Sequence, residues 1–344
     1  MFERFGVAFW NDLPCQELRR LGHRADELGF DSVWLAESYH YRSIPPVAAA
    51  IGCDTRRIRI ALGVLPTHTR HPGLVAMEAA TLDELTGGRL ILGLGAAIKA
   101  AALHGVEAGP LTVMRDTVTI VRRLLAGERV THRGRAWSIA NAALSFPARA
   151  GLPLYVGTYP YSPQMLKLTG ALADGVVLVW CTPEWVRRAG EMVAEGAHQA
   201  GRDPASVDLA AYLVMSVDPD PVKARAACKP LIASYAPRPV KWREAGLATA
   251  EDIEPVLAAM DRGGLQAATA AVSDALVDKI AIAGDPSYCR DRLREYASAG
   301  LRLPIAYQVL GPDRQLGMEL IAREFLSRSA RPALEPARPD PARP

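Results

Sequence analysis

The sequence predicts an α/β fold, a (β/α)8 TIM barrel with insertions, and three observations favour it. Residues 58–95 have the pattern of a buried strand, a polar loop, an amphipathic helix and a second buried strand, which is the βαβ unit of a parallel sheet. Strand and helix patterns keep alternating over the remaining chain. The length of 344 residues suits one barrel, because such barrels often run to about 250 residues or more as a single unit.

The first half of the chain contains four of the expected strands. Strands are expected at residues 5–9, 31–36, 58–65 and 90–94, and helices at residues 16–28, from Pro72 to the Gly87–Gly88 pair, and at residues 112–125. Gly29 should end the first helix, because glycine readily adopts the left-handed conformation common after a last helical turn. Proline is favoured in the first turn of a helix and glycine after its last turn, so Pro72 and the Gly87–Gly88 pair bound the second helix.

The second half supplies the other four strands, with two interruptions. Strands are expected at residues 154–156, 176–179, 208–217 and 305–310, and helices at residues 163–173, 183–200 and 315–326. Residues 131–148 alternate in the manner of a β-hairpin, and residues 221–271 are mostly helical with proline and glycine breaks. We therefore expect one barrel domain over residues 1–328 with these two insertions, followed by a disordered Pro/Arg-rich tail over residues 329–344.

The composition excludes several kinds of partner. Forty basic and 37 acidic side chains leave a net charge of +3 without the basic stripe that nucleic-acid binding requires. No apolar run reaches the roughly 18 residues of a membrane-spanning helix, so we expect a cytoplasmic protein without a membrane partner. Five cysteines, without CxxC spacing or neighbouring histidines, indicate reduced thiols and no metal site.

Side chains at the carboxyl ends of the strands are the candidates for chemistry, because helices cover the other surfaces of a parallel barrel. The candidates follow the second to the fifth strand: Glu37, Ser38, Tyr39, His40 and Tyr41; Gly63, Val64, Leu65, Thr67, His68, Thr69 and Arg70; Gly95, Ala96, Ala97 and Lys99; and Gly157, Thr158, Tyr159, Tyr161 and Ser162.

Two of these loops could bind a phosphate group. Residues 157–164 lead into a helix with Pro163 at its first position and Ser162 as its N-cap, and the free backbone N–H groups of a helix start attract anions. The LILGLG strand is a weaker signal, since its glycines allow close approach but the distant acidic residue of a dinucleotide-binding pattern is absent. Lys99 and Arg115 could also contact an anion, although Arg115 suits an exposed position equally well.

Three residues are candidates for proton transfer. Imidazole titrates near neutrality, so a histidine could deliver the proton that accompanies a hydride; His40 is the first choice, and His68 and Glu37 are the other candidates. The alternative for each histidine is a single structural hydrogen bond in a loop. The residues alone leave both roles open.

The amino-acid sequences of several segments also resemble those of a known family. The run ALGVLPTHTRHP, followed by AMEAATLDELTGGRLILGLG, resembles the luciferase-like flavin monooxygenase superfamily. Within that superfamily it is most similar to the coenzyme F420-dependent reductases, typified by methylenetetrahydromethanopterin reductase. The segments LGFDSVWLAES, LPLYVGT with QMLKLTGALADGVVL, and VSDALVDKIAIAGDPSYCRDRLREYASAG match the family in order, over roughly residues 5–300.

The resemblance implies a binding site for a flavin or deazaflavin ring. It maps a bulged third strand with a non-prolyl cis peptide, the shelf behind the central ring, onto Gly63, Val64 and Leu65. The other implied cofactor contacts are Gly95, Ala96, Ala97, Gly157, Thr158, Tyr161 and Ser162. Tyr161 could stack on the cofactor or only cover the barrel mouth. The chain departs from the family pattern at Ser38, at Ala96–Ala97 and at Tyr161–Ser162, where relatives have a histidine, a glycine or acid, and glycines.

The resemblance also implies the function. The favoured expectation is an F420-dependent oxidoreductase that exchanges a hydride with a small organic substrate, acting as a homodimer. One alternative is an FMN-dependent monooxygenase on the same barrel. Another is a non-catalytic homologue that serves as a binding partner, which the departures at Ser38 and Ala96–Ala97 mildly favour. Retention of F420, of FMN or of neither cofactor separates the three.

Overall fold

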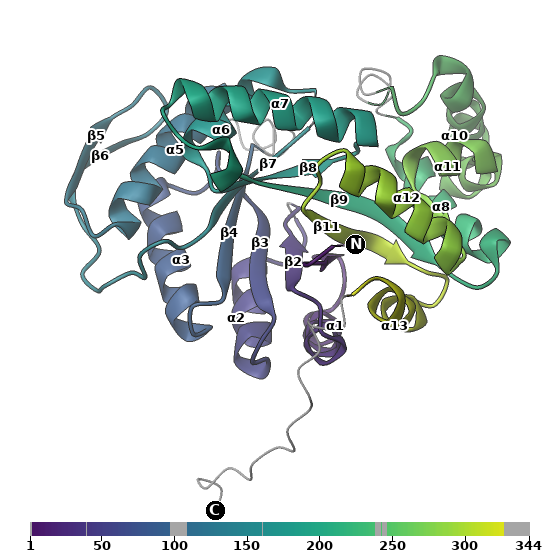
Figure 1. Ribbon diagram of the computed structural model, residues 1–344, viewed down its shortest axis with the longest axis horizontal. Helices are drawn as coiled ribbons and strands as arrows, with labels where there is room; N and C mark the ends of the chain where they lie inside the picture. The colour runs from purple at the N-terminus through teal and green to yellow at the C-terminus, as the bar shows by residue number, and fades with distance from the viewer. Residues whose placement is uncertain are drawn as a thin grey trace, which may run out of the picture.

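Eight parallel strands close into a barrel in the computed structural model, which describes residues 2–38, 40–96, 109–159, 161–237, 242 and 246–326. The strands are β1 (Gly6–Trp10), β2 (Ser32–Ala36), β3 (Arg59–Pro66), β4 (Leu90–Gly95), β7 (Leu154–Thr158), β8 (Gly175–Val179), β9 (Asp208–Val217) and β11 (Leu303–Leu310). Each of these strands pairs with the next along the chain, and β11 pairs with β1, so the eight strands form a closed ring (Figure 1). A short ninth strand, β10 (Ile282–Gly284), pairs with the end of β9. The predicted (β/α)8 barrel and its eight strands are confirmed.

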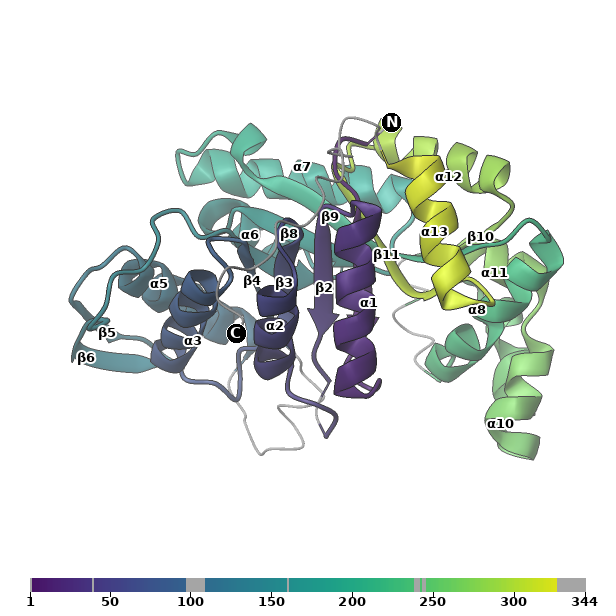
Figure 2. The same cartoon turned by 90° about the horizontal axis from the view of Figure 1, so that it is seen from below.

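Helices surround the barrel between successive strands (Figures 1 and 2). They are α1 (Cys15–Leu28), α2 (Ile44–Asp54), α3 (Pro72–Leu85), α5 (Pro110–Leu125), α6 (Pro163–Leu172), α7 (Pro183–Gln199), α12 (Pro286–Ser298) and α13 (Arg314–Phe325). Gly29 ends α1 with a left-handed φ of 85°, as predicted. Helix α2 is not among the expected helices, because its opening Ile-Pro-Pro resembles a loop although proline fits a first helical turn.

Additional elements occupy the two segments that interrupt the strand–helix rhythm. Strands β5 (Val130–Arg133) and β6 (Ser138–Ala142) form an antiparallel pair beside α5. The later segment contains α8 (Pro221–Tyr235) and α10 (Ala250–Ala271), which is kinked at Gly263 and Gly264; α11 (Asp274–Ile280) and β10 (Ile282–Gly284) follow. Both views show α10 and the β5–β6 pair on opposite sides of the barrel (Figures 1 and 2). The tail over residues 329–344 lies outside the described residues.

Strand alternation separates two apolar layers. Val7, Phe9 and similar residues of each strand face the helices, whereas the alternate residues face the barrel interior. Large interior side chains lie opposite small ones, since Trp34 is level with Ala8 and Ala61 on the neighbouring strands. The interior is therefore filled with side chains rather than open.

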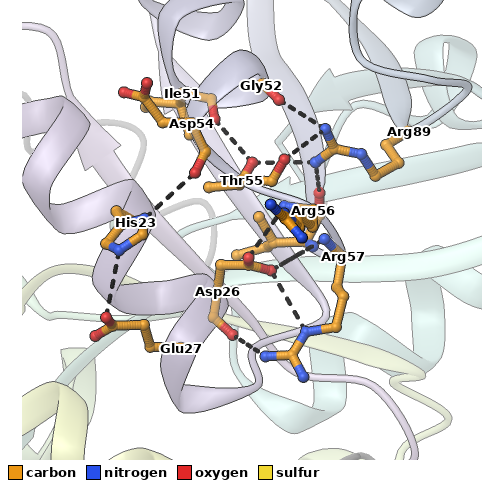
Figure 3. Close-up of polar contacts among 11 residues, drawn as sticks. His23, Asp26, Glu27, Ile51, Gly52, Asp54, Thr55, Arg56, Arg57 and Arg89 are labelled. Carbon is orange, nitrogen blue, oxygen red and sulfur yellow. Dashed lines mark hydrogen bonds and ion pairs between the residues drawn. The ribbon is translucent and has the colours of Figure 1, made fainter. Parts of the chain in front are cut away.

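Aspartates close the amino-terminal end of the barrel. Asp26, Asp83 and Asp174 each accept the backbone N–H at the start of a strand, from Ile58 at 2.7 Å, Leu90 at 3.2 Å and Leu154 at 2.9 Å. Arg89 donates to the carbonyl oxygens of Gly52 and Thr55, at 2.7 and 3.0 Å (Figure 3). It also donates to those of Ile58 and Thr86, at 2.9 and 2.7 Å, and so joins the end of α2 to the start of β4. This network fixes where β3 and β4 begin.

Candidate active site at the barrel mouth

Strand β3 carries a bulge at its carboxyl end. Leu62 pairs with Leu92 and Leu65 with Leu94, so Gly63 and Val64 together oppose the single residue Gly93. A bulge of this kind can direct two successive residues to one face of the sheet. The Gly63–Val64 peptide bond is cis. These are the residues onto which the family resemblance maps the cofactor shelf.

The side chain of Val64 occupies space that two glycines leave open. A Cβ atom would lie 2.2 Å from a Val64 methyl carbon at Gly95 and 2.8 Å at Gly157, whereas at Gly93 it would first meet the Leu62 carbonyl oxygen, at 2.3 Å. The glycines at the ends of β4 and β7 therefore have a packing reason within the chain. In the sequence, the Gly93–Gly95 pattern indicates close approach of a cofactor. The tertiary structure shows that Val64 lies against Gly95.

The carbonyl of Gly63 has a partner from the far side of the barrel. The Tyr212 hydroxyl donates a hydrogen bond of 2.6 Å to the Gly63 oxygen. A Cβ on Gly63 would lie 2.3 Å from that hydroxyl oxygen and 2.7 Å from the Trp34 ring. Tyr212 was not among the predicted site residues, because it belongs to the interior of β9 and its sequence position gives no sign of the contact.

Glu37 is held by two neighbours at the end of β2. Its carboxylate accepts hydrogen bonds of 2.5 and 3.2 Å from Arg70, and another of 3.0 Å from the Ile44 N–H at the start of α2. The Glu37 side chain is only 6% exposed. Glu78 on α3 lies 3.9 Å from the same guanidinium, and burial raises the pKa of its carboxyl group. Arg70 thus joins two carboxylates at the rim of the barrel.

Asn11 fixes the loop that carries His40. Its amide donates to the carbonyls of Ser38, at 3.0 Å, and Arg42, at 2.5 Å, while its oxygen accepts the Ser38 N–H at 3.2 Å. His40, between these anchors, is exposed and has a left-handed φ of 68°. The predicted proton donor is therefore at the surface of a tethered loop. Asn11 is a functional candidate that the sequence analysis missed, although its place directly after β1 was a usable signal.

His68 has a different environment from His40. It lies directly after β3 and is only 3% exposed. The preceding Thr67 donates both its N–H and its hydroxyl to the Gly95 carbonyl, at 3.0 and 3.2 Å, which ties this loop to the end of β4. Of the three candidates for proton transfer, His68 is buried in the loop after β3, Glu37 is ion-paired and His40 is exposed.

Helix α6 begins at the predicted residue, and the loop that joins it to β7 contains aromatic rings. Ser162 is the N-cap residue of α6 and Pro163 its first residue, but the Ser162 side chain makes no capping bond. Tyr161 stacks on Tyr159 at 5.3 Å between ring centroids and meets Trp185 edge-on at 6.1 Å. Gly157 and Thr158, which precede this stack, are half-buried.

The loop after β4 is described only at its start. Ala96 follows β4 and is half-buried. Tyr39, Ala97 and Lys99 lie outside the described residues. Arg115 is exposed on α5, in agreement with the surface alternative.

Buried polar atoms at the mouth suit a polar ligand. The indole nitrogen of Trp10, at the end of β1, and the hydroxyl of Thr69 are buried and have no hydrogen-bond partner among the described residues. Leaving such a group unpaired costs about 1–3 kcal/mol. An apolar shelf next to unpaired donors matches the needs of a flat ring system with polar edges, so these residues fit a flavin or deazaflavin.

The described parts of the chain contain neither a cluster of metal ligands nor a membrane-spanning helix. No group of three His, Cys, Asp or Glu residues there could hold a metal ion. None of the helices there is long and apolar enough to span a bilayer.

Comparison with known proteins gives the family. The model of the luciferase-like monooxygenase family matches residues 5–303. A 5,10-methylenetetrahydromethanopterin reductase from Methanolobus tindarius is 32% identical, over 94% of this chain and 99% of its own length. An F420-dependent glucose-6-phosphate dehydrogenase from Microbacterium testaceum is 31% identical, over 63% of this chain and 69% of its own.

A solved structure is similar over nearly the whole chain. The F420-dependent tetrahydromethanopterin reductase from Methanopyrus kandleri superposes with a TM-score of 0.86 and 28% sequence identity, covering 94% of this chain and 98% of that one. The family-model match spans the first seven barrel strands, with the β3 bulge, and ends at the first residue of β11. The chain therefore belongs to the luciferase-like monooxygenase family.

Proposed function

We propose that this chain is an F420-dependent oxidoreductase that transfers a hydride between the deazaflavin and a small organic substrate. The main support is its end-to-end similarity to the Methanolobus reductase, which leaves almost none of that relative unmatched. When bound, F420 would supply the hydride-carrying ring. The part of the chain's own residues is to hold that ring, exclude water and move a proton.

The shelf residues Gly63, Val64 and Leu65 would hold the ring. Val64 supports this role because its side chain is braced from behind by the backbone of β4 and β7 and is itself only half-buried. The remaining contacts would come from Gly95, Ala96, Ala97, Gly157, Thr158, Tyr161 and Ser162. The start of α6 would receive the phosphate, since the first N–H groups of a helix have no partner within the helix.

We propose His68 as the first residue to test for proton transfer. It is buried in the loop that follows the strand carrying the shelf, whereas His40 is exposed. Glu37 is less suited, because its charge is already neutralised by Arg70 and its oxygens are engaged. Both remain candidates to test in parallel.

A cofactor titration tests the proposal. F420 or FMN is titrated into the purified protein, and binding is followed by quenching of cofactor fluorescence. Binding of F420 over FMN, followed by bleaching of F420 with a substrate, supports the oxidoreductase. Preference for FMN would support the monooxygenase alternative. Binding of neither cofactor would overturn both and favour the non-catalytic alternative.

The similarity also suggests the first substrates. Methylenetetrahydromethanopterin is the first to assay with reduced F420, because the relative that matches from end to end is named for it. Glucose 6-phosphate, assayed with oxidised F420, is the comparison, since that relative matches a smaller share of the chain. A higher rate with the sugar phosphate would reverse the assignment.

We further propose a cytoplasmic homodimer. Helix α3 exposes Leu74, Met77 and Leu85, which are 42%, 47% and 52% exposed, on one side of the helix. Such a stripe is unusual on a monomer surface and suits a second copy of the chain. Light scattering should give twice the monomer mass, and Met77→Lys should shift it toward the monomer. The five free thiols fit a reducing compartment.

A further inference from the structure

Tyr212 spans the barrel from the strand opposite the bulge. In the closed order, β9 is the fourth strand from β3 in both directions, through β4, β7 and β8 or through β2, β1 and β11. Its side chain crosses the interior and ends on the Gly63 carbonyl at 2.6 Å. The contact joins residues 149 positions apart in sequence.

The ring of Tyr212 is fixed on both sides. It stacks on Tyr307 at 4.8 Å with an interplanar angle of 27°, and Trp34 meets it edge-on at 6.1 Å. The residue is 8% exposed, and burial raises the pKa of its hydroxyl well above the ordinary range. The hydroxyl therefore remains protonated and donates its hydrogen bond throughout the physiological pH range.

Gly63 in turn is shaped for this contact. The absent side chain leaves the space that the phenol oxygen occupies, since a Cβ would lie 2.3 Å from it. The bulge removes Gly63 and Val64 from regular pairing with β4, because paired residues resume only at Leu65. The phenol thus satisfies a buried carbonyl at the position where the strand ladder is interrupted.

We propose that Tyr212 is a positioning residue that sets the height of the β3 shelf, and so the affinity for the cofactor ring. This rests on the proposed function, because the shelf matters only if a flavin or deazaflavin lies on it. Tyr212 would act through Gly63 and Val64 without touching the cofactor. The stacked Tyr307 and the edge of Trp34 give the shelf a rigid support from the opposite wall.

The test compares two buried phenols. Tyr212→Phe removes the hydroxyl and keeps the ring. Tyr296→Phe is the matched control, because Tyr296 is 4% exposed and donates a bond of 2.8 Å to another backbone carbonyl, that of Cys181. We expect Tyr212→Phe to bind F420 roughly three- to tenfold more weakly, the equivalent of one hydrogen bond, while Tyr296→Phe binds as the wild type does. Melting temperatures should fall by similar amounts in both variants.

Hydrogen exchange of backbone amides tests the same proposal in the absence of the cofactor. In Tyr212→Phe the amides of Gly63, Val64, Leu65 and Thr67 should exchange faster than in wild type, and in Tyr296→Phe they should not. Unchanged F420 affinity together with unchanged exchange would overturn the proposal, as would equal loss of affinity in both variants. If the wild type bound no F420, the proposed function would fail, and unchanged exchange at residues 63–67 would then also refute the support of the shelf by Tyr212.

Discussion

At the amino-terminal end of the barrel, polar side chains find partners within the chain, whereas at the carboxyl-terminal end buried donors and bent backbone remain. Asp26, Asp83 and Asp174 cap strand starts, and Arg89 binds four carbonyls. At the other end, Trp10 and Thr69 have unpaired atoms. Among the described residues, four of the five non-glycine residues with positive φ also lie at or after strand ends on this side: His40, Trp180, Gln308 and Leu310.

The difference separates stability from function within one fold. The aspartates and Arg89 satisfy the hydrogen-bonding needs of the strand starts, whereas Trp10 and Thr69 at the other end keep buried polar atoms without a partner among the described residues, as expected where a ligand is received. Substitutions at the amino-terminal end should therefore change the free energy of unfolding and leave cofactor affinity intact. Substitutions at the mouth should do the reverse.

The largest effect is expected at Arg89. Arg89→Ala leaves the carbonyls of Gly52, Thr55, Ile58 and Thr86 without their charged donor, and should lower the free energy of unfolding by about 3–4 kcal/mol. Urea denaturation measures this loss, with the exposed Arg115→Ala as control. F420 affinity of the folded variant should stay within about twofold of wild type. A large loss of affinity at Arg89 would mean that the two ends are not independent.

The second-largest effect is expected on the rate of hydride transfer when His68, the residue proposed for proton transfer, is replaced. His68→Ala should leave F420 affinity nearly unchanged and lower the hydride-transfer step by roughly 10²-fold, as the loss of a general acid does. Single-turnover absorbance of F420 measures that step. His40→Ala should retain most of the rate, because that imidazole is exposed. The opposite ranking would return the role to His40, and full rates in both would direct attention to Glu37.

A smaller effect is expected from filling the space behind the shelf. Gly95→Ala places a methyl group 2.2 Å from Val64, so Val64 must move toward the ring position. We expect roughly tenfold weaker F420 binding with little change in unfolding free energy. Val64→Ala in the same chain should restore part of the affinity by reopening the space. Failure of the double variant to recover would show that Val64 is not what Gly95 accommodates.

The sequence could predict features that depend on neighbouring residues, but not features that depend on contacts between distant strands. All eight strands followed from local apolar patterns, and Gly29 and Pro72 marked helix ends, because those signals lie within a few residues. Helix α2 was missed since its tandem prolines obscure the helical pattern. The bulge at Gly63 came only from family resemblance. The contacts of Gly63 with Tyr212, and of Val64 with Gly95 and Gly157, join distant strands that no local pattern connects.

The smallest effect is a pH dependence at the amino-terminal end. Burial alone would raise the pKa of Asp208, but hydrogen bonds from Arg4, at 2.8 Å, and Tyr155, at 2.6 Å, outweigh it and lower the pKa. A carboxylate with a lowered pKa stabilises the fold above its unfolded-state value of about 3.9 and loses that contribution as the pH falls through the folded-state value.

Arg4→Ala should therefore cost about 1 kcal/mol at pH 7, since the arginine is 32% exposed, and progressively less below about pH 4. Urea denaturation of both proteins at pH 7, 5 and 3 measures the difference. Arg4→Ala in an Asp208→Asn background should cost little and show no such pH dependence. A cost in wild type that stayed constant down to pH 3 would mean that Arg4 acts through packing rather than through its charge.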